Sequence, residues 1–220
     1  MDSAGGFARS SIGRKVIMAS TGVILVVYVI GHMIGNLQVY GGPEGINAYG
    51  KFLHTFIHGQ AIWIARIVLL AAVLLHIWSA TSLTLTSRKA RGIGYREQEW
   101  KESTYASRTM RWGGVIILLF VIYHVLHFTT GSLHPDFVPG DVYHNFVTGF
   151  RVVPVSIAYI AAMIALGLHL RHGVWSMFQT LGVSHPRYIG AAHVAAWVVA
   201  IAVTVGNISF PLAVLAGVVK

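Results

Sequence analysis

The sequence predicts an all-α integral membrane protein with five transmembrane helices. Of its 220 residues, 55% are hydrophobic and only 10% are charged, and the mean hydropathy is +0.66, which is typical of membrane proteins and not of soluble domains. Backbone groups in lipid must be hydrogen-bonded within the chain, which favours helices over open strands. Five windows without Asp, Glu, Lys or Arg reach or approach the roughly 20 residues that a spanning helix needs: 16–43, 67–87, 112–135, 152–170 and 188–219.

The links between these windows are too short to form a second folded domain. The first helix ends at YGGPEG, residues 40–45, where Gly and Pro predict a turn. The partly amphipathic segment 45–60 is expected to lie at the outer membrane interface, before the second helix begins. We therefore expect a single transmembrane domain over residues 1–220, with helices at about 15–40, 61–87, 111–131, 152–178 and 188–218.

The other links also have features that end helices or face water. The link between the second and third helices, 88–111, mixes both signs of charge and is the surface on which we expect a cytoplasmic partner to bind. The next link contains HPDFVPGDVYHNF, 134–146, in which two prolines and a glycine break the helix. Pro154 then suits the first turn of the fourth helix. The fifth helix follows GVSHPRY, 182–188.

The net charge of +9 predicts membrane orientation and not nucleic-acid binding, because the basic residues are unevenly divided between the two sides. The positive-inside rule then places the N-terminus in the cytoplasm and the C-terminus outside, in a cytoplasmic membrane of bacterial or archaeal type. The predicted outer side has only Lys51, Arg66, Arg151 and Lys220. The predicted inner side has Arg9, Arg14, Lys15, Arg88, Lys89, Arg91, Arg96, Lys101, Arg108, Arg111, Arg171 and Arg187.

The sequence contains no cysteine. The chain therefore has no thiolates for a zinc site or an iron–sulfur cluster. It also lacks the C-x-x-C-H motif that attaches c-type haem. Any redox cofactor held by this chain must be bound through other residues.

Histidines at two depths are the main candidates for such binding. Ionisable side chains within transmembrane segments are costly and point to function. His32 and His124 lie about 7 or 8 residues from the outer ends of their helices, on the order of 10–12 Å deep. His76 and His169 lie about 16 or 17 residues from theirs, on the order of 25 Å deep. We name these two sets the outer pair and the inner pair.

One histidine from each of two helices at one level matches the two axial positions of a haem iron. We therefore expect helices one to four to form a bundle around two stacked haems, with all four paired histidines as metal ligands. Gly31 and Gly35 flank His32 and would let helices approach the flat ring. His127 and His172 are expected at the helix edges instead. Interhelical hydrogen bonds and a histidine-based metal or proton transporter are the alternatives.

Four segments around these histidines resemble the cytochrome b membrane anchor of succinate:quinone oxidoreductases, in its single-chain, five-helix, dihaem type. The segments are STGVILVVYVIGHM (20–33), LLHIWSATSLTLTSRK (74–89), RWGGVIILLFVIYHV (111–125) and LGLHLRHGVWSMFQTLGV (166–183). The resemblance implies non-covalent haem b at both levels, with the inner pair nearer the cytoplasmic subunits. It also implies an iron–sulfur subunit and a flavoprotein with FAD as partners, the flavoprotein holding the dicarboxylate site.

The resemblance further implies electron transfer from the iron–sulfur subunit to a membrane quinone, which we expect to be menaquinone. Protons for the quinone would come from outer groups, for which Lys51, His54, His58 and Glu44 are candidates. Arg14, Arg111, Arg171 and His172 are candidates for binding haem propionates. The anchor of another respiratory enzyme, such as nitrate reductase, formate dehydrogenase or hydrogenase, is the alternative with a similar mechanism.

Overall fold

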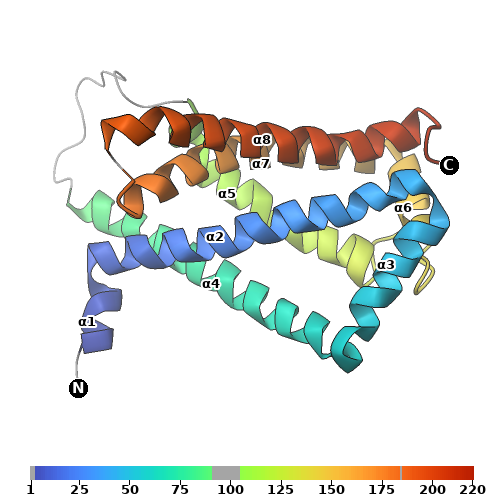
Figure 1. Ribbon diagram of the computed structural model, residues 1–220, viewed down its shortest axis with the longest axis horizontal. Coiled ribbons are helices and arrows are strands. Elements are labelled where there is room, and N and C mark those ends of the chain that lie inside the picture. The colour runs from blue at the N-terminus through green and yellow to red at the C-terminus, as the bar shows by residue number, and fades with distance from the viewer. Residues whose placement is uncertain (1–2, 91–104, 184) are drawn as a thin grey trace.

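A computed structural model describes residues 3–90, 105–183 and 185–220, and these form helices and short connections (Figure 1). Five helical stretches are long and apolar enough to cross a membrane, so the predicted all-α membrane fold is confirmed. The predicted partner surface on the 88–111 link lies largely outside the described residues, because 91–104 are not described. The assignment of the whole chain to one domain stays a prediction.

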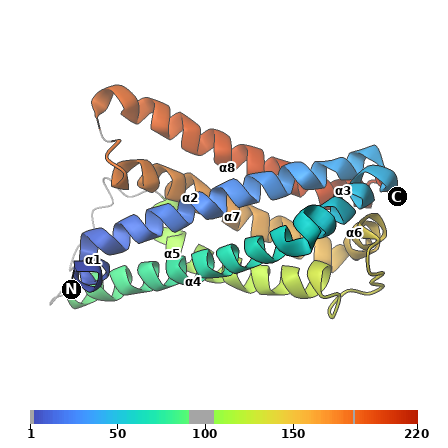
Figure 2. The same cartoon turned by 60° about the horizontal axis from the view of Figure 1, so that its bottom comes forward.

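The five long helices pack as a bundle with antiparallel neighbours. They are α2 (Ser11–Asn36), α4 (Gln60–Lys89), α5 (Tyr105–His124), α7 (Val153–Thr180) and α8 (Pro186–Leu215). Helix α7 contacts α2, α5 and α8, whereas α4 packs mainly on α2 (Figures 1 and 2). Many large apolar side chains of α4 and α5 are exposed. These faces suit lipid contact, because lipid replaces water around a membrane bundle.

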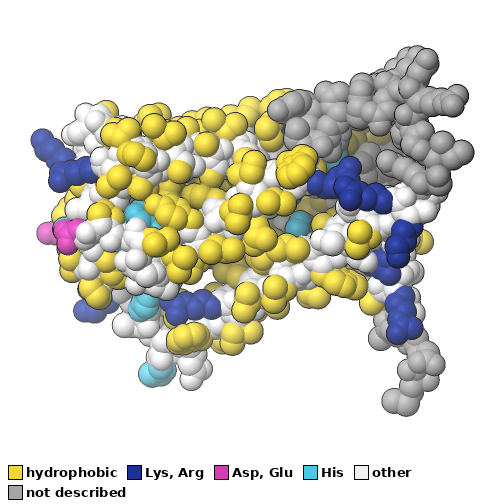
Figure 3. Space-filling view, turned by 180° about the vertical axis from the view of Figure 1, so that it is seen from behind, with side chains coloured by type: hydrophobic (Ala, Val, Ile, Leu, Met, Phe, Trp, Pro, Cys, Tyr) yellow, Lys and Arg dark blue, Asp and Glu magenta, His cyan; other side chains and the backbone are white. Residues whose placement is uncertain are grey.

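Charged side chains gather mostly toward the two ends of the bundle, and an apolar belt lies between them (Figure 3). The short helix α1 (Ser3–Arg9) lies at one end, which we call the α1 end. At the opposite end, the α3–α6 end, lie η1 (Leu37–Gly41), α3 (Pro43–Thr55), η2 (Phe56–Gly59), η3 (Val125–Thr129) and α6 (Val142–Arg151).

The first backbone N–H groups of α6 donate hydrogen bonds to side chains from two parts of the chain. The first amides of a helix have no partner within the helix and need caps. Asp141 Oδ1 accepts the His144 backbone N–H at 3.0 Å, and Asn47 Oδ1 of α3 accepts the Tyr143 N–H at 2.9 Å. The Asn47 amide also donates to Asp141 Oδ1 at 3.0 Å. The His144 N–H and the Asn47 amide lower the pKa of Asp141, because both stabilise its charged form.

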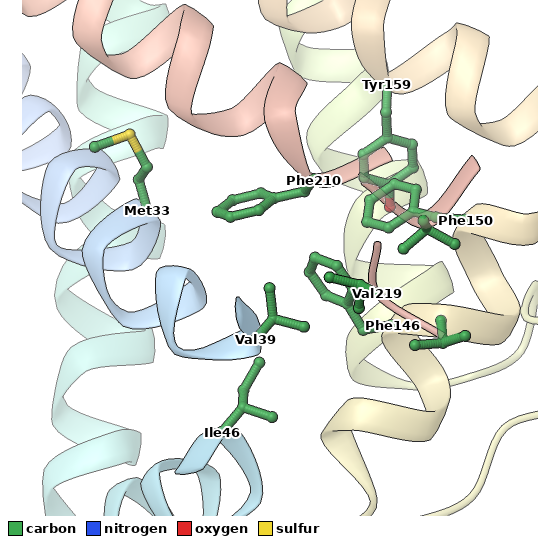
Figure 4. Packing of buried hydrophobic residues seen from close by; sticks show 10 residues of the cluster. Met33, Val39, Ile46, Phe146, Phe150, Tyr159, Phe210 and Val219 are labelled. Carbon is green, nitrogen blue, oxygen red and sulfur yellow. The ribbon is translucent and has the colours of Figure 1, made fainter. Parts of the chain in front are cut away.

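The main apolar core lies at the α3–α6 end, where side chains from α2, η1, α3, α6, α7 and α8 meet (Figure 4). The rings of Phe146 and Phe150 in α6 meet edge to face, with their centres 4.9 Å apart. Phe150 also contacts the Tyr159 ring of α7 at 5.0 Å. The cluster consists of Met33, Val39, Ile46, Phe146, Val147, Phe150, Tyr159, Phe210, Val214 and Val219. Tyr159 is therefore one of the buried residues that join α6 and α7 at this end.

Candidate cofactor-binding site

The structure brings the four paired histidines together in the pairs that their depths predict. The ring centres of His32 on α2 and His124 on α5 are 5.7 Å apart. Those of His76 on α4 and His169 on α7 are 6.3 Å apart. Each pair therefore joins two helices that are not consecutive in the chain.

These separations can be compared with the geometry of a metal held between two imidazoles. A metal–nitrogen bond to imidazole is about 2.0–2.1 Å long, and the nitrogen lies about 1.1 Å from the ring centre, so two ligands on opposite sides place their ring centres about 6.2 Å apart. The inner pair matches this separation at 6.3 Å, and the outer pair at 5.7 Å is slightly closer. The donor set and its spacing therefore fit a bis-histidine haem at the inner level, whereas the outer level needs a small adjustment of its rings.

In the inner pair, the His76 ring is held by hydrogen bonds, whereas His169 Nδ1 has no hydrogen-bond partner among the described residues. His76 Nδ1 lies 3.2 Å from the Met18 carbonyl oxygen and 3.2 Å from Thr21 Oγ1. This leaves His76 Nε2 for a ligand, in the way that metal-binding histidines usually donate their other nitrogen to a carbonyl. His169 Nδ1 is buried and has no hydrogen-bond partner among the residues that the structure describes.

Two glycines lie against the inner pair. A Cβ added to Gly22 would lie 3.7 Å from His76 Cε1, and a Cβ added to Gly114 would lie 3.9 Å from His169 Cε1. These contacts are ordinary van der Waals distances, so the glycines leave only a small amount of space beside each ring. Neither glycine was among the residues selected from the sequence.

The outer pair is surrounded by aromatic groups. His124 Nδ1 lies 3.2 Å from the Tyr159 hydroxyl oxygen. His32 stacks on Tyr28 at 5.6 Å, and its Nε2 lies 3.2 Å from Asn36 Nδ2. The Asn36 contact must be released, or the His32 ring turned, before His32 Nε2 can bind a metal.

His127 lies in the last turn of its helix, as the sequence predicts, but its burial was not predicted. Its side chain is fully buried, at 0% exposure. The cause is local, because residues 125–129 form a π turn, η3, in which the Thr130 N–H donates to the Val125 carbonyl oxygen at 3.0 Å. Such a turn contains one more residue than an α-helical turn and changes where the following side chains point. His127 Nδ1 consequently lies 3.0 Å from the same Tyr159 hydroxyl oxygen.

The glycines that flank His32 have different surroundings. A Cβ added to Gly35 would lie 2.6 Å from Tyr49 Cε1, so Gly35 allows the close approach of α3 to α2. A Cβ added to Gly31 would meet nothing within 4 Å, and this position is open. Of the two glycines, only Gly31 has space beside it that a flat ring could occupy.

The basic candidates for propionate binding are engaged in other contacts or exposed. Arg14 Nη1 donates to Thr86 Oγ1 at 3.1 Å, and this bond joins α2 to α4. The Arg171 guanidinium lies 4.0 Å from the centre of the Trp197 ring. Arg111 is exposed and His172 is half-buried.

The outer candidates for proton delivery lie at the corner between α3 and α4. His54 and His58 line a groove of about 610 Å³, together with Trp63 and Arg66. Lys51 is exposed on α3 and does not line this groove. His58 has a positive φ of 54°, which is strained for a residue with a side chain.

Within the part of the chain that the structure describes, no three His, Cys, Asp or Glu side chains are placed to bind a metal ion together. Protein sites for bare transition metals usually supply three or four ligands. The imidazoles come in pairs instead, which is the number of ligands in a bis-histidine haem.

The comparisons with known proteins identify a family. The family described as the succinate dehydrogenase/fumarate reductase transmembrane subunit matches residues 87–208, which is more than half of the chain. His124 and His169 lie in the matched region, whereas His32 and His76 precede it. Searches of curated proteins and of solved structures gave no match. The chain therefore belongs to the family of succinate dehydrogenase/fumarate reductase transmembrane subunits.

Proposed function

We propose that this chain is a dihaem cytochrome b anchor that relays electrons from an iron–sulfur subunit to menaquinone. The observation that supports the proposal best is the pairing of four imidazoles from four helices, at ring-centre distances of 5.7 and 6.3 Å. Family membership supplies the enzyme complex in which such a relay operates. With a haem held by each pair of histidines, the chain would supply one-electron transfer.

The residues around the inner pair have identifiable tasks. If His76 carries its hydrogen on Nδ1, the Met18 carbonyl and the Thr21 hydroxyl accept it, which sets the ring orientation and leaves Nε2 for a ligand. A ligand held in this way is more basic and less free to rotate. The glycines at 22 and 114 keep side chains away from both rings.

The two ends of the bundle have different tasks in this proposal. We place the α1 end in the cytoplasm, because basic residues are most frequent there and the positive-inside rule applies. The iron–sulfur subunit and the flavoprotein then bind at this end, near the inner pair. The membrane is the cytoplasmic membrane of a bacterium or archaeon, with the C-terminus outside.

The groove between α3 and α4 is the proposed route for protons to the quinone. His54 and His58 line it beside Arg66, and Lys51 lies on the preceding helical turn. Lys51, His54 and His58 belong to the α3–α6 end, on the side of the outer pair, and Arg66 lies in the second turn of α4. A quinone near His32 and His124 would therefore find ionisable groups between itself and water.

The family match distinguishes between the alternatives. It favours the succinate dehydrogenase and fumarate reductase complexes over the anchors of nitrate reductase, formate dehydrogenase or hydrogenase. The paired arrangement of the histidines argues against a metal transporter, which would require more ligands at one point.

The test is a reduced-minus-oxidised spectrum of the purified complex, with haem quantified as the pyridine haemochrome. Two b haems per chain are expected. His127→Ala and His172→Ala serve as controls, because these histidines are three residues from the proposed ligands and should leave both haems bound. A colourless protein, or loss of a haem in either control, would contradict the assignment.

A further inference from the structure

Two imidazoles share one hydroxyl group beside the outer pair. The Tyr159 oxygen lies 3.2 Å from His124 Nδ1 and 3.0 Å from His127 Nδ1. Tyr159 is on α7 and is 5% exposed, whereas the two histidines come from α5 and η3. The sequence predicted neither a role for Tyr159 nor the burial of His127.

Counting hydrogens determines the direction of these two bonds. A phenol has one hydrogen to donate, and its oxygen can also accept. If His124 binds iron through Nε2, its hydrogen is on Nδ1, and it must donate to the Tyr159 oxygen. The Tyr159 hydrogen is then directed to His127 Nδ1, and the hydrogen of a neutral His127 is on Nε2. The reverse direction would require a hydrogen on His124 Nε2 and would block that nitrogen.

We propose that Tyr159 is a positioning residue for the outer axial ligand His124, with His127 as the final acceptor of the directed chain. The inference rests on the proposed function, because the direction follows from iron binding by His124. Accepting a hydrogen bond from an axial imidazole makes that ligand more basic. A more basic ligand stabilises oxidised iron, so Tyr159 lowers the midpoint potential of the outer haem.

The surroundings keep the Tyr159 hydroxyl in place. Its ring contacts Phe120 edge to face at 4.9 Å and Phe150 at 5.0 Å. These contacts come from α5 and α6, and Figure 4 shows the Phe150 ring beside Tyr159. Aromatic edge-to-face contacts restrict ring rotation through packing and quadrupole attraction.

The His127 ring is held mainly by stacking on two neighbouring rings. Its ring is stacked between Tyr123 at 5.4 Å and His134 at 4.8 Å. His134 is itself fixed, because its Nε2 lies 2.8 Å from the Asn145 carbonyl oxygen and its Nδ1 accepts the Asp136 N–H at 3.1 Å. His127 Nε2 has no partner among the described residues, so the Tyr159 bond is the hydrogen bond that orients this ring.

The experiment is a redox titration of both haems in the complete complex containing Tyr159→Phe, followed by absorbance. Both haems should remain bound. The ratio of reduced to oxidised outer haem at a fixed applied potential should rise about tenfold, equivalent to about 59 mV for a one-electron couple. The inner haem should not change. His124→Ala, which lacks the outer haem, identifies the signal of each haem.

Tyr123→Phe is the matched control, since it removes the same hydroxyl from a ring that also contacts His127. It should leave both potentials unchanged. His127→Leu is the second variant. It should raise the midpoint potential of the outer haem by less than Tyr159→Phe does, because the Tyr159 oxygen is still present but accepts more weakly once its own hydrogen has no acceptor. This variant decides the case if Tyr159→Phe does not assemble.

Unchanged potentials in Tyr159→Phe, or an equal shift of both haems, would overturn the inference. So would an unchanged outer potential in His127→Leu. These results differ from failure of the proposed function, in which the wild-type complex itself contains no pair of b haems.

Discussion

The pairing of the four histidines predicts how haem content responds to single and double substitutions. Each imidazole lies close to one partner, with ring centres 5.7 Å apart in the outer pair and 6.3 Å apart in the inner pair. Any single replacement by Ala should lower the haem content from two per chain to one. The double variant His76→Ala/His169→Ala should still bind one haem, because both changes affect the same level. The double variant His76→Ala/His124→Ala should bind none.

The assay is haem per purified chain, measured as the pyridine haemochrome against protein concentration. The two double variants remove the same number of imidazoles and differ only in their distribution between the levels. They are therefore controls for each other with respect to general destabilisation. One haem in His76→Ala/His124→Ala together with none in His76→Ala/His169→Ala would refute the pairing.

Three further predictions concern packing, pH and ligand support. Gly167→Ala places a Cβ onto Thr204 Oγ1 of α8 and should destabilise the protein by about 1–3 kcal/mol, whereas Gly190→Ala, with open space around it, should not; thermal unfolding in detergent compares them. The lowered pKa of Asp141 stabilises the fold above the unfolded value of about 3.9. The stability advantage of wild type over Asp141→Ala should therefore be present at pH 6 and diminish as the pH falls through the folded pKa, in unfolding curves across that range. Thr21→Val should retain both haems and raise the midpoint potential of the inner haem. The ratio of reduced to oxidised inner haem at a fixed applied potential should rise less than tenfold, because the main-chain acceptor of His76 remains.

The fold was accessible from the sequence because transmembrane helices leave a direct record in the charge distribution. Gaps between charged residues indicate the spans, and a constant rise per residue converts sequence position into depth. This is why His32 could be matched with His124, and His76 with His169, before any contact was known. Depth is the one coordinate that such counting supplies.

Rotation about the helix axes could not be predicted in the same way. Tyr159 lies in an apolar segment without any local motif, and its importance depends on which face of α7 meets α5. The burial of His127 was not predicted, because the π turn at 125–129 is not visible in the residue pattern. A tyrosine at the same depth as His124 was the available signal, and counting Tyr as well as His by depth would have found it. Gly35 illustrates the same limit, since its neighbour Tyr49 comes from an interfacial helix.

The shared cap of α6 has a consequence for the order of assembly. Asn47 and Tyr143 are 96 residues apart, and closing a contact over such a distance costs more entropy than forming local turns. During synthesis α3 is complete long before α6 exists, so the Asn47 side chain cannot yet bond to Tyr143 or Asp141 at that stage. The bond can form only after α4 and α5 have been inserted. Completion of the α3–α6 end is therefore a late step of membrane insertion, and a defect at Asn47 would delay maturation while the individual helices form normally.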